Sequence, residues 1–215
     1  MQAIYYDNVR SEMSTFLPDS YSKVLEVGCG EGTFRQHLKK THEYWGIEPV
    51  QEAYDVSKSV LDNVILGTYE SARPKLPENY FDLVICNDVI EHMIDHDAFF
   101  RSIKKHLQDG AHIIASIPNV RYLLNLFELL VKRDWQYKDQ GTLDRTHLRF
   151  FTQKSLLKTI ADHQFGIDKF EGINPYRGNS FAKRGAGLFA SMVFGKDVNY
   201  LQFGMRLVVQ NNKAE

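Results

Sequence analysis

The chain has 215 residues, of which 43% are hydrophobic and 25% are charged; these values are ordinary for a globular protein, and the length suits one α/β domain better than two. Its formal net charge of -1 provides no overall basic field for phosphate backbones, so nucleic acid is not expected as a partner. Because we find neither a signal-peptide pattern nor about 18 to 20 consecutive apolar residues, we expect no transmembrane segment and a cytoplasmic location.

Strand-like and helix-like segments alternate through the first 117 residues, a pattern typical of a mostly parallel sheet. Helices are predicted over residues 33–40 and 97–107, and Pro49 suits the first turn of another helix. Asp109-Gly110 predicts a turn into the fifth strand. The strands are predicted over residues 23–27, 44–48, 63–67, 81–87 and 111–117.

The pattern changes after Pro118. Residues 121–131 have helical propensity and are apolar almost all round, which indicates a buried element or a lid. Thr152 is a good N-cap for a helix that runs to His163. Two last strands are predicted over residues 165–171 and 200–210.

An insert with several glycines lies between these last strands, over residues 172–196. Its basic and apolar pieces suit a substrate lid, a peripheral membrane contact or a homodimer interface, and a packed or disordered loop is the plain alternative. We predict one domain over residues 1–215, with a doubly wound, seven-stranded, mostly parallel sheet whose last strand is antiparallel. Its parts are an N-terminal helical cover over 1–20, a cofactor-binding core over 21–117 and substrate-side elements over 118–215.

The first strand runs into a glycine-rich loop, Glu26-Val27-Gly28-Cys29-Gly30-Glu31-Gly32. Glycines permit a tight turn and let backbone N–H groups approach a ligand closely. The NAD fingerprint G-x-G-x-x-G would need glycine at position 33, where this chain has Thr33. Glu26, two places before the first glycine, can receive the ammonium of an amino-acid moiety, which a pyrophosphate cofactor lacks.

Glu48 ends the second strand, 20 positions after Gly28 (48 − 28). This is the separation expected of a carboxylate that holds a ribose diol. Two charge-assisted hydrogen bonds would contribute roughly 1.5–3 kcal/mol each to cofactor binding. The loop and the carboxylate together, at the ends of successive strands, indicate a nucleoside cofactor.

The segments VLEVGCGEG, GIEP and FDLVICNDVIEHM resemble the first, second and fourth strand-end motifs of class I, Rossmann-like S-adenosylmethionine-dependent methyltransferases, over roughly residues 21–117. The resemblance implies S-adenosyl-L-methionine as the cofactor. Thr68 stands where the family often has an acidic residue, so adenine would meet the Thr68 hydroxyl or the backbone of Tyr69. The other cofactor-binding residues that the resemblance implies are Gly28, Cys29 and Gly30 beneath methionine and ribose, Glu26 near the amino group, Glu48 on the ribose, and Asn87 at the methionine portion.

The segment from Gly141 to Thr152 brings an Asp, a His and two Arg residues into six positions. His147 can act as the base that takes a proton from the acceptor, with Asp144 orienting its ring, and Arg145 or Arg149 can hold an anionic acceptor. The alternative is structural: salt bridges for the charged residues and a buttress for the next helix from His147.

SIPNVRY and LDRTHLRFFT resemble a bacterial subgroup of these methyltransferases that is associated with polysaccharide and O-antigen biosynthesis. This resemblance implies a sugar hydroxyl or a sugar nucleotide as the acceptor. The segment from Glu91 to Asp97 is also rich in His and acidic residues, but consecutive loop residues rarely converge on an ion without a second segment, so no metal is expected.

The sequence therefore predicts an enzyme that transfers a methyl group to a small-molecule acceptor, at an oxygen in preference to a nitrogen. Two alternatives remain: a catalytically inactive cofactor-binding scaffold, and a methyltransferase that acts on protein or RNA. A nicotinamide dehydrogenase is disfavoured by Thr33.

Overall fold

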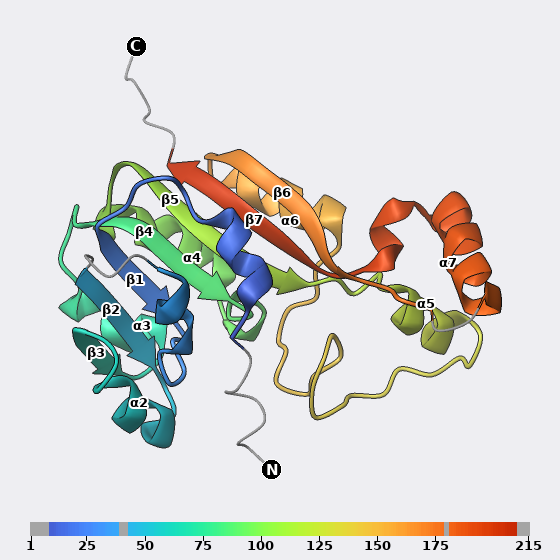
Figure 1. Ribbon diagram of the computed structural model, residues 1–215, viewed down its shortest axis with the longest axis horizontal. Helices are drawn as coiled ribbons and strands as arrows, with labels where there is room; N and C mark the ends of the chain where they lie inside the picture. The colour runs from blue at the N-terminus through green and yellow to red at the C-terminus, as the bar shows by residue number, and fades with distance from the viewer. Residues whose placement is uncertain (1–8, 39–42, 179–180, 210–215) are drawn as a thin grey trace.

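A seven-stranded sheet runs through the computed structural model, which describes residues 9–38, 43–178 and 181–209 (Figure 1). The strand order is β3-β2-β1-β4-β5-β7-β6. The strands are β1 (Lys23–Val27), β2 (Glu43–Glu48), β3 (Asn63–Leu66), β4 (Phe81–Asn87), β5 (Leu107–Pro118), β6 (Phe165–Pro175) and β7 (Tyr200–Val209).

Strands β1 to β5 pair in parallel, and β7 lies antiparallel between β5 and β6. The seven-stranded α/β sheet with an antiparallel last strand is therefore confirmed. The apolar run over 81–87 forms β4, which is buried between β1 and β5 as a central parallel strand should be. The carboxyl ends of β1, β2 and β4 meet at one edge, where ligands bind in open α/β sheets.

Two hydrophobic clusters cover the two faces of the sheet. One cluster packs α3, α4 and α6 against the strands, through side chains such as Phe99 and Leu156. The other packs η1 and η2, through Phe16 and Phe34. The helices are α2 (Gln51–Ser57), α3 (Tyr69–Ala72), α4 (His96–Ile103), α5 (Leu123–Leu130), α6 (Gln153–Asp162) and α7 (Phe181–Phe194), and the short 3-10 turns include η1 (Ser11–Phe16), η2 (Thr33–His37), η4 (Ile90–His92) and η6 (Lys196–Asn199).

Some boundaries differ from the sequence prediction. The segment predicted as a helix over 33–40 forms a 3-10 turn over Thr33–His37, and residues 39–42 lie outside the described part. Strand β5 starts at Leu107, so Asp109-Gly110 lies inside it, where Gly110 has a φ of 73° and the pairing with β4 is irregular. Thr152 caps α6 as predicted, through a reciprocal bond with Ser155. Of the predicted cover over 1–20, the turn η1 is described, whereas residues 1–8 lie outside the described part.

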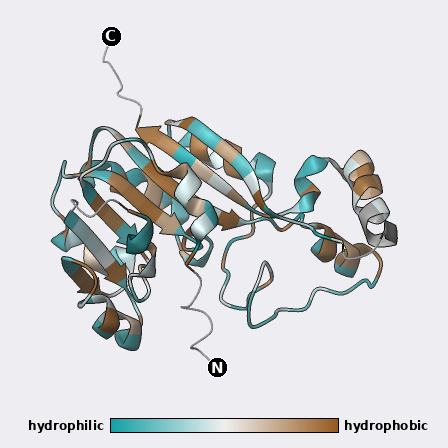
Figure 2. Cartoon of the chain, viewed as in Figure 1, coloured by the Kyte–Doolittle hydropathy of each residue, from teal (hydrophilic) through white to brown (hydrophobic). Residues whose placement is uncertain are grey.

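Helices α5 and α7 lie together at the end of the molecule farthest from β3, beyond the sheet (Figure 1). Both carry hydrophobic residues at the surface (Figure 2). Of the two alternatives for 121–131, the buried element is wrong, because Leu124 and Leu130 are 48% and 57% exposed. The lid stays a prediction. In α7, Leu188 and Met192 are 69% and 83% exposed. No helix within the described residues has the length and apolar character needed to cross a membrane.

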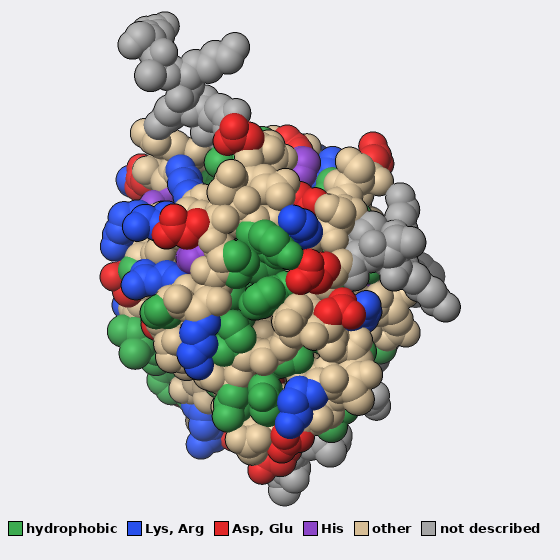
Figure 3. All heavy atoms as spheres, turned by 90° about the vertical axis from the view of Figure 1, so that its left-hand side faces the viewer, with side chains coloured by type: hydrophobic (Ala, Val, Ile, Leu, Met, Phe, Trp, Pro, Cys, Tyr) green, Lys and Arg blue, Asp and Glu red, His purple; other side chains and the backbone are tan. Residues whose placement is uncertain are grey.

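The opposite end of the molecule has a mixed surface (Figure 3). Lys and Arg side chains alternate there with Asp and Glu around a hydrophobic strip. Val56, Val60 and Leu66 are exposed hydrophobic residues of α2, β3 and the turn between them. The described residues of this face therefore form no basic surface of the kind that holds a nucleic-acid backbone.

Candidate functional site

The loop between β1 and η2 is built on three glycines with left-handed backbone. Gly28, Gly30 and Gly32 have φ angles of 71°, 53° and 79°, a conformation that residues with a Cβ rarely adopt. The N–H groups of Gly28 and Cys29 both donate to the carbonyl of Ile47, at 2.8 and 3.1 Å. The loop is therefore fastened to β2 and presents bare backbone at the carboxyl edge of the sheet.

Glu48 ends β2 directly beside this loop. Its Oε2 accepts the N–H of Gly30 at 2.8 Å, and its Oε1 accepts the N–H of Val50 at 2.9 Å. Burial raises the pKa of Glu48, and these two bonds act in the opposite direction. The predicted spacing from Gly28 thus corresponds to a real contact between the carboxylate and the loop.

Glu26 lies on β1 with its side chain buried. Its pKa is raised to about 8: burial is the main cause, the hydrogen bond from the Tyr44 hydroxyl at 2.8 Å acts in the opposite direction, and the nearby Glu48 charge adds to the rise. The carboxyl group is therefore largely protonated at neutral pH in the free protein. A cation placed beside it would favour the ionised form.

Thr68 and Tyr69 follow β3 and begin α3. The Thr68 side chain is exposed, whereas the Tyr69 ring is buried with its hydroxyl 3.0 Å from the Ser102 hydroxyl. The Tyr69 hydroxyl is therefore engaged within the protein, whereas the Thr68 side chain is open to a ligand at this strand end.

Asn87, at the end of β4, carries an unsatisfied amide. Its Oδ1 and Nδ2 are both buried, and neither has a hydrogen-bond partner within the described residues. Buried polar atoms without partners are rare and costly in native proteins. The Oδ1 acceptor and the Nδ2 donor of Asn87 thus suit a ligand that binds at this position.

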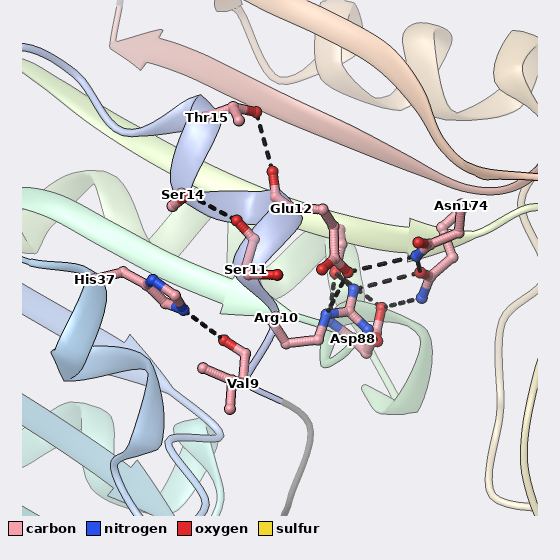
Figure 4. Close-up of polar contacts among 11 residues, drawn as sticks. Val9, Arg10, Ser11, Glu12, Ser14, Thr15, His37, Asp88 and Asn174 are labelled. Atoms are coloured by element: carbon pink, nitrogen blue, oxygen red, sulfur yellow. Dashed lines mark hydrogen bonds and ion pairs between the residues drawn. The ribbon is translucent and has the colours of Figure 1, made fainter.

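The next residue, Asp88, anchors a polar network that the sequence prediction missed (Figure 4). Asp88 has a φ of 54°, a strained conformation for a residue other than glycine. Its carboxylate pairs with Arg10 and accepts hydrogen bonds from Ser116 and Gln202, each at 2.8 Å. Arg10 also donates to Ser116 at 2.7 Å and lies 3.3 Å from a carboxylate oxygen of Glu12. The network ties the N-terminal segment to the ends of β4, β5 and β7.

Glu91 and His92 form the η4 turn after β4, and His147 reaches them from the loop before α6. The carbonyl of Glu91 accepts the N–H groups of Leu148 and Arg149, at 2.9 and 3.0 Å. His147 is buried, and its Nε2 lies 4.0 Å from Oε1 of Glu91. Burial, and then the charge of Asp88, raise the pKa of Glu91, whereas burial and His147 lower the pKa of His92.

Asp144 does not hold the His147 ring in this structure. Nδ1 of His147 lies 3.0 Å from the carbonyl of Thr142, while Oδ1 of Asp144 accepts the N–H and the hydroxyl of Thr146, at 2.8 and 2.6 Å. These bonds lower the pKa of Asp144, although its burial acts in the opposite direction. Asp144 therefore shapes the loop, and a backbone carbonyl orients the histidine.

The two arginines do not converge on one anion site. Arg145 is exposed and pairs with Asp139 at 2.7 Å. The Arg149 guanidinium donates to the carbonyls of Leu148 and Ile94. Neither contact belongs to the glycine loop or to η4.

Solved structures share this fold. A methyltransferase from Archaeoglobus fulgidus, described as S-adenosylmethionine-dependent, superposes with a TM-score of 0.64 over 95% of this chain and 93% of its own, at 16% identity. A second one, from Aquifex aeolicus, gives 0.59 over 94% and 90%, at 13% identity. These likenesses show the fold.

Curated relatives are similar in sequence over part of their length. The ubiquinone biosynthesis O-methyltransferase of Aliivibrio fischeri is 28% identical over 146 residues, which cover 64% of this chain and 61% of the relative. The corresponding protein of Vibrio cholerae is 28% identical over 149 residues, which cover 66% of this chain and 59% of the relative. The chain thus spans about three fifths of the length of these relatives.

The site has the groups that S-adenosylmethionine needs: a glycine loop with free backbone, a carboxylate at the end of β2 and an unpartnered amide at the end of β4. A family model described as a methyltransferase domain matches residues 1–169. The chain belongs to this methyltransferase family, and its cofactor is S-adenosyl-L-methionine.

Proposed function

We propose that the chain methylates an oxygen of a small molecule, a saccharide or a similar hydroxylated metabolite. The observation that carries this proposal is the position of His147. Its imidazole is held with Nε2 toward the turn that follows β4, whose end carries the unpartnered Asn87. A side chain that can accept a hydroxyl proton thus lies at the same carboxyl edge of the sheet as the glycine loop.

The cofactor-binding residues that we propose are those of the strand ends. Gly28, Cys29 and Gly30 pass beneath the methionine and the ribose, and Glu48 accepts the ribose hydroxyls. Asn87 supplies one donor and one acceptor to the methionine portion, which its partnerless amide supports. Glu26 lies near the amino group, and adenine meets the Thr68 hydroxyl or the backbone of Tyr69.

When bound, S-adenosylmethionine supplies an electrophilic methyl group, whose bond to sulfur breaks, with the electron pair going to sulfur, as the acceptor oxygen takes the methyl carbon. The protein has to hold that oxygen about 3 Å from the methyl carbon and accept its proton. The carbonyl of Thr142 can only accept a hydrogen bond, so Nδ1 of His147 carries the proton of the neutral ring. Nε2 is then left with a lone pair, and we propose that His147 activates the hydroxyl through it.

A pocket beside α7 supports a small acceptor. It measures about 350 Å³ and lies where β6 ends, β7 begins and α7 passes, within the range of small-molecule sites. The residues that line the pocket include the aromatic Tyr176 and Tyr200, the amide residue Asn199 and the apolar Leu188. Polar and aromatic groups of this kind suit a ring-shaped hydroxylated molecule, and we propose that Tyr176 and Leu188 of the insert form one wall of the acceptor site.

An acceptor from ubiquinone biosynthesis is the second candidate. The relatives at 28% identity are named for that pathway, and the exposed hydrophobic residues of α5 and α7 would suit an apolar molecule. Arg145 and Arg149 do not form a clamp for an anionic acceptor, so neither candidate depends on them.

The test is a methyl-transfer screen with isotope-labelled cofactor. Monosaccharides, sugar nucleotides, phenolic quinone precursors and amines are the four acceptor groups, with mass spectrometry to locate the new methyl group. We expect an O-methylated saccharide. Methylation of the phenols alone would support the second candidate, and methylation of the amines alone would contradict transfer to oxygen.

His147→Ala should lower turnover by roughly 10²–10⁴-fold, because the group that handles the hydroxyl proton is removed. The affinity for S-adenosylhomocysteine should not change. Asp144→Asn should have a smaller effect, since Asp144 bonds to Thr146 and not to the ring. Equal turnover in His147→Ala and the wild type, measured with the best acceptor of the screen, would return His147 to a structural role.

A further inference from the structure

Three ligating side chains converge at the η4 turn. Glu91, His92 and His147 each place one ligand atom within 4.8 Å of the other two. Glu91 and His92 are neighbours in sequence, and His147 comes from a loop and lies 55 positions after His92 (147 − 92). The backbone of that loop is bonded to the Glu91 carbonyl. The second segment that a metal site requires, and that the sequence did not reveal, is thus supplied by this loop.

Both histidines are fixed in the form that binds a metal ion. Nδ1 of His92 lies 3.1 Å from the carbonyl of Thr146, and Nδ1 of His147 lies 3.0 Å from the carbonyl of Thr142. A carbonyl only accepts, so each Nδ1 carries the ring proton and each Nε2 keeps its lone pair. Metal-binding histidines are oriented by backbone carbonyls in this same way.

The carboxyl group of Glu91 is buried without a hydrogen-bond partner within the described residues. Glu91 is 1% exposed, and neither of its oxygens has a hydrogen-bond partner within the described residues. The nearest ring nitrogen, Nε2 of His147, is 4.0 Å away. A buried carboxylate in a protein is normally hydrogen-bonded, paired or bound to a metal.

We propose that Glu91, His92 and His147 bind a divalent transition-metal ion. Two imidazoles and one carboxylate are the ligands that ions such as Zn²⁺ and Fe²⁺ accept. Ligand atoms about 2.0–2.2 Å from one ion lie roughly 3–3.5 Å apart, so the side chains need to draw in by about 1 Å. Rotation about the last side-chain bonds supplies this movement, because the backbone on both sides is already joined.

Three protein ligands leave the ion an open position, as in catalytic zinc sites. The open position would take the acceptor oxygen, and the bound hydroxyl would lose its proton more readily, to solvent water, before it attacks the methyl carbon. In this form of the mechanism the Nε2 lone pair of His147 binds the ion, so His147 acts through the ion in place of taking the proton itself. Binding of the ion is independent of the proposed function, whereas this catalytic role rests on it.

The test is metal binding by the full chain, without an affinity tag and after removal of ions by a chelator. Calorimetry with Zn²⁺ should show one ion per chain with micromolar or tighter affinity, and Co²⁺ should give the visible spectrum of a site with nitrogen ligands. Glu91→Gln and His147→Ala should each weaken binding at least tenfold. His112→Ala is the matched control, since His112 pairs with Asp168 on the far part of β5, and it should bind as the wild type does.

A wild-type chain that takes up neither ion would overturn the proposal, as would unchanged affinity in Glu91→Gln and His147→Ala. If a variant fails to fold, X-ray absorption by the zinc-loaded wild type decides, because two imidazole ligands are expected and any other count contradicts the site. Binding of S-adenosylhomocysteine, measured on the same samples, keeps a failure of the metal site distinct from a failure of the methyltransferase.

Discussion

At the scale of single residues, Glu48 both fastens the glycine loop and is the carboxylate that we propose for the ribose. Its two oxygens accept the N–H groups of Gly30 and Val50 in the free protein. Glu48→Ala removes the carboxylate that we propose for the ribose and also the bond that holds the loop. Because charge-assisted hydrogen bonds contribute roughly 1.5–3 kcal/mol each, calorimetry should show S-adenosylhomocysteine binding at least tenfold more weakly. Glu52→Ala, at an exposed position in α2, should bind normally, and equal affinities in the two variants would contradict the assignment.

Glu26 makes the stability of the protein depend on pH. Its pKa is about 8 in the folded protein against an ordinary value of 4.5, so between these values the folded chain keeps a proton that the unfolded chain has lost. The stability from this group is complete below pH 4.5 and is lost as the pH rises toward 8, with a slope of roughly 1.4 kcal/mol per pH unit. Glu26→Gln keeps an oxygen for the Tyr44 hydroxyl and removes this slope.

Urea unfolding of the wild type and of Glu26→Gln at pH 5.5, 6.5 and 7.5 measures the effect. The free energy of unfolding of the wild type should fall relative to that of the variant across this range. Parallel profiles would show that the carboxyl group is not held protonated.

How far the site can be predicted from the sequence depends on distance along the chain. Spacing along the chain predicts that three features lie at neighbouring strand ends: Glu26, the glycine loop and Glu48. One strand and one turn connect them. The Asp88 network does not, because its partners Arg10, Ser116 and Gln202 come from three other elements. The same holds for His147, whose position beside Glu91 depends on how a long loop returns to η4.

At the scale of elements, the β1–η2 loop works because it lies close to its neighbours. A Cβ at Gly28 would lie 2.6 Å from Cγ2 of Val89, in the loop after β4, and the backbone there is left-handed. Gly28→Ala should therefore displace the loop and weaken S-adenosylhomocysteine binding by more than tenfold, as measured by calorimetry. Gly110 has a φ of 73° and no atom within 4 Å of a Cβ, so Gly110→Ala has the same backbone strain without the contact.

Comparing Gly28→Ala with Gly110→Ala separates the effect of backbone strain from that of the close contact with Val89. Both variants should lose about 1 kcal/mol of stability, from the unfavourable φ alone, whereas only Gly28→Ala should lose affinity. Val89→Ala added to Gly28→Ala should restore part of the binding. No restoration, or equal loss in Gly110→Ala, would mean that the close approach is not what the glycine provides.

The sequence predicts the bounds of an element best where the element is a buried run of apolar residues. The apolar strands β1, β2 and β4 begin and end within one residue of the predicted bounds. The prediction was wrong at Asp109-Gly110, because a turn-forming pair can also be a bulge inside a strand when sheet pairing continues on both sides. The buried-element alternative for α5 was also wrong, since an apolar helix has the same sequence whether it is buried or lies at the surface.

At the scale of the whole molecule, the mostly parallel sheet follows from the alternation of strands and helices, whereas the order of its strands and the association of α5 with α7 do not. These two helices present a hydrophobic surface beyond the sheet (Figure 2). Isolated monomers rarely expose hydrophobic surface over two adjacent helices, and such surfaces mark contacts with a protein or a membrane. Of the homodimer and the membrane contact that the sequence suggested, we expect the homodimer, since a helix pair on one copy can pack against the same pair on another.

Leu188→Glu and Met192→Glu test this expectation, because a charge cannot be buried unpaired in the interface. The wild type should have twice the 24.9 kDa of the chain in sedimentation equilibrium at micromolar concentration, and both variants should be monomers. Val56→Glu, at a 44% exposed hydrophobic position in α2, is the control and should stay dimeric. A monomeric wild type that sediments with phospholipid vesicles would assign the surface to a membrane, and dissociation of Val56→Glu would place the interface at the opposite end of the molecule.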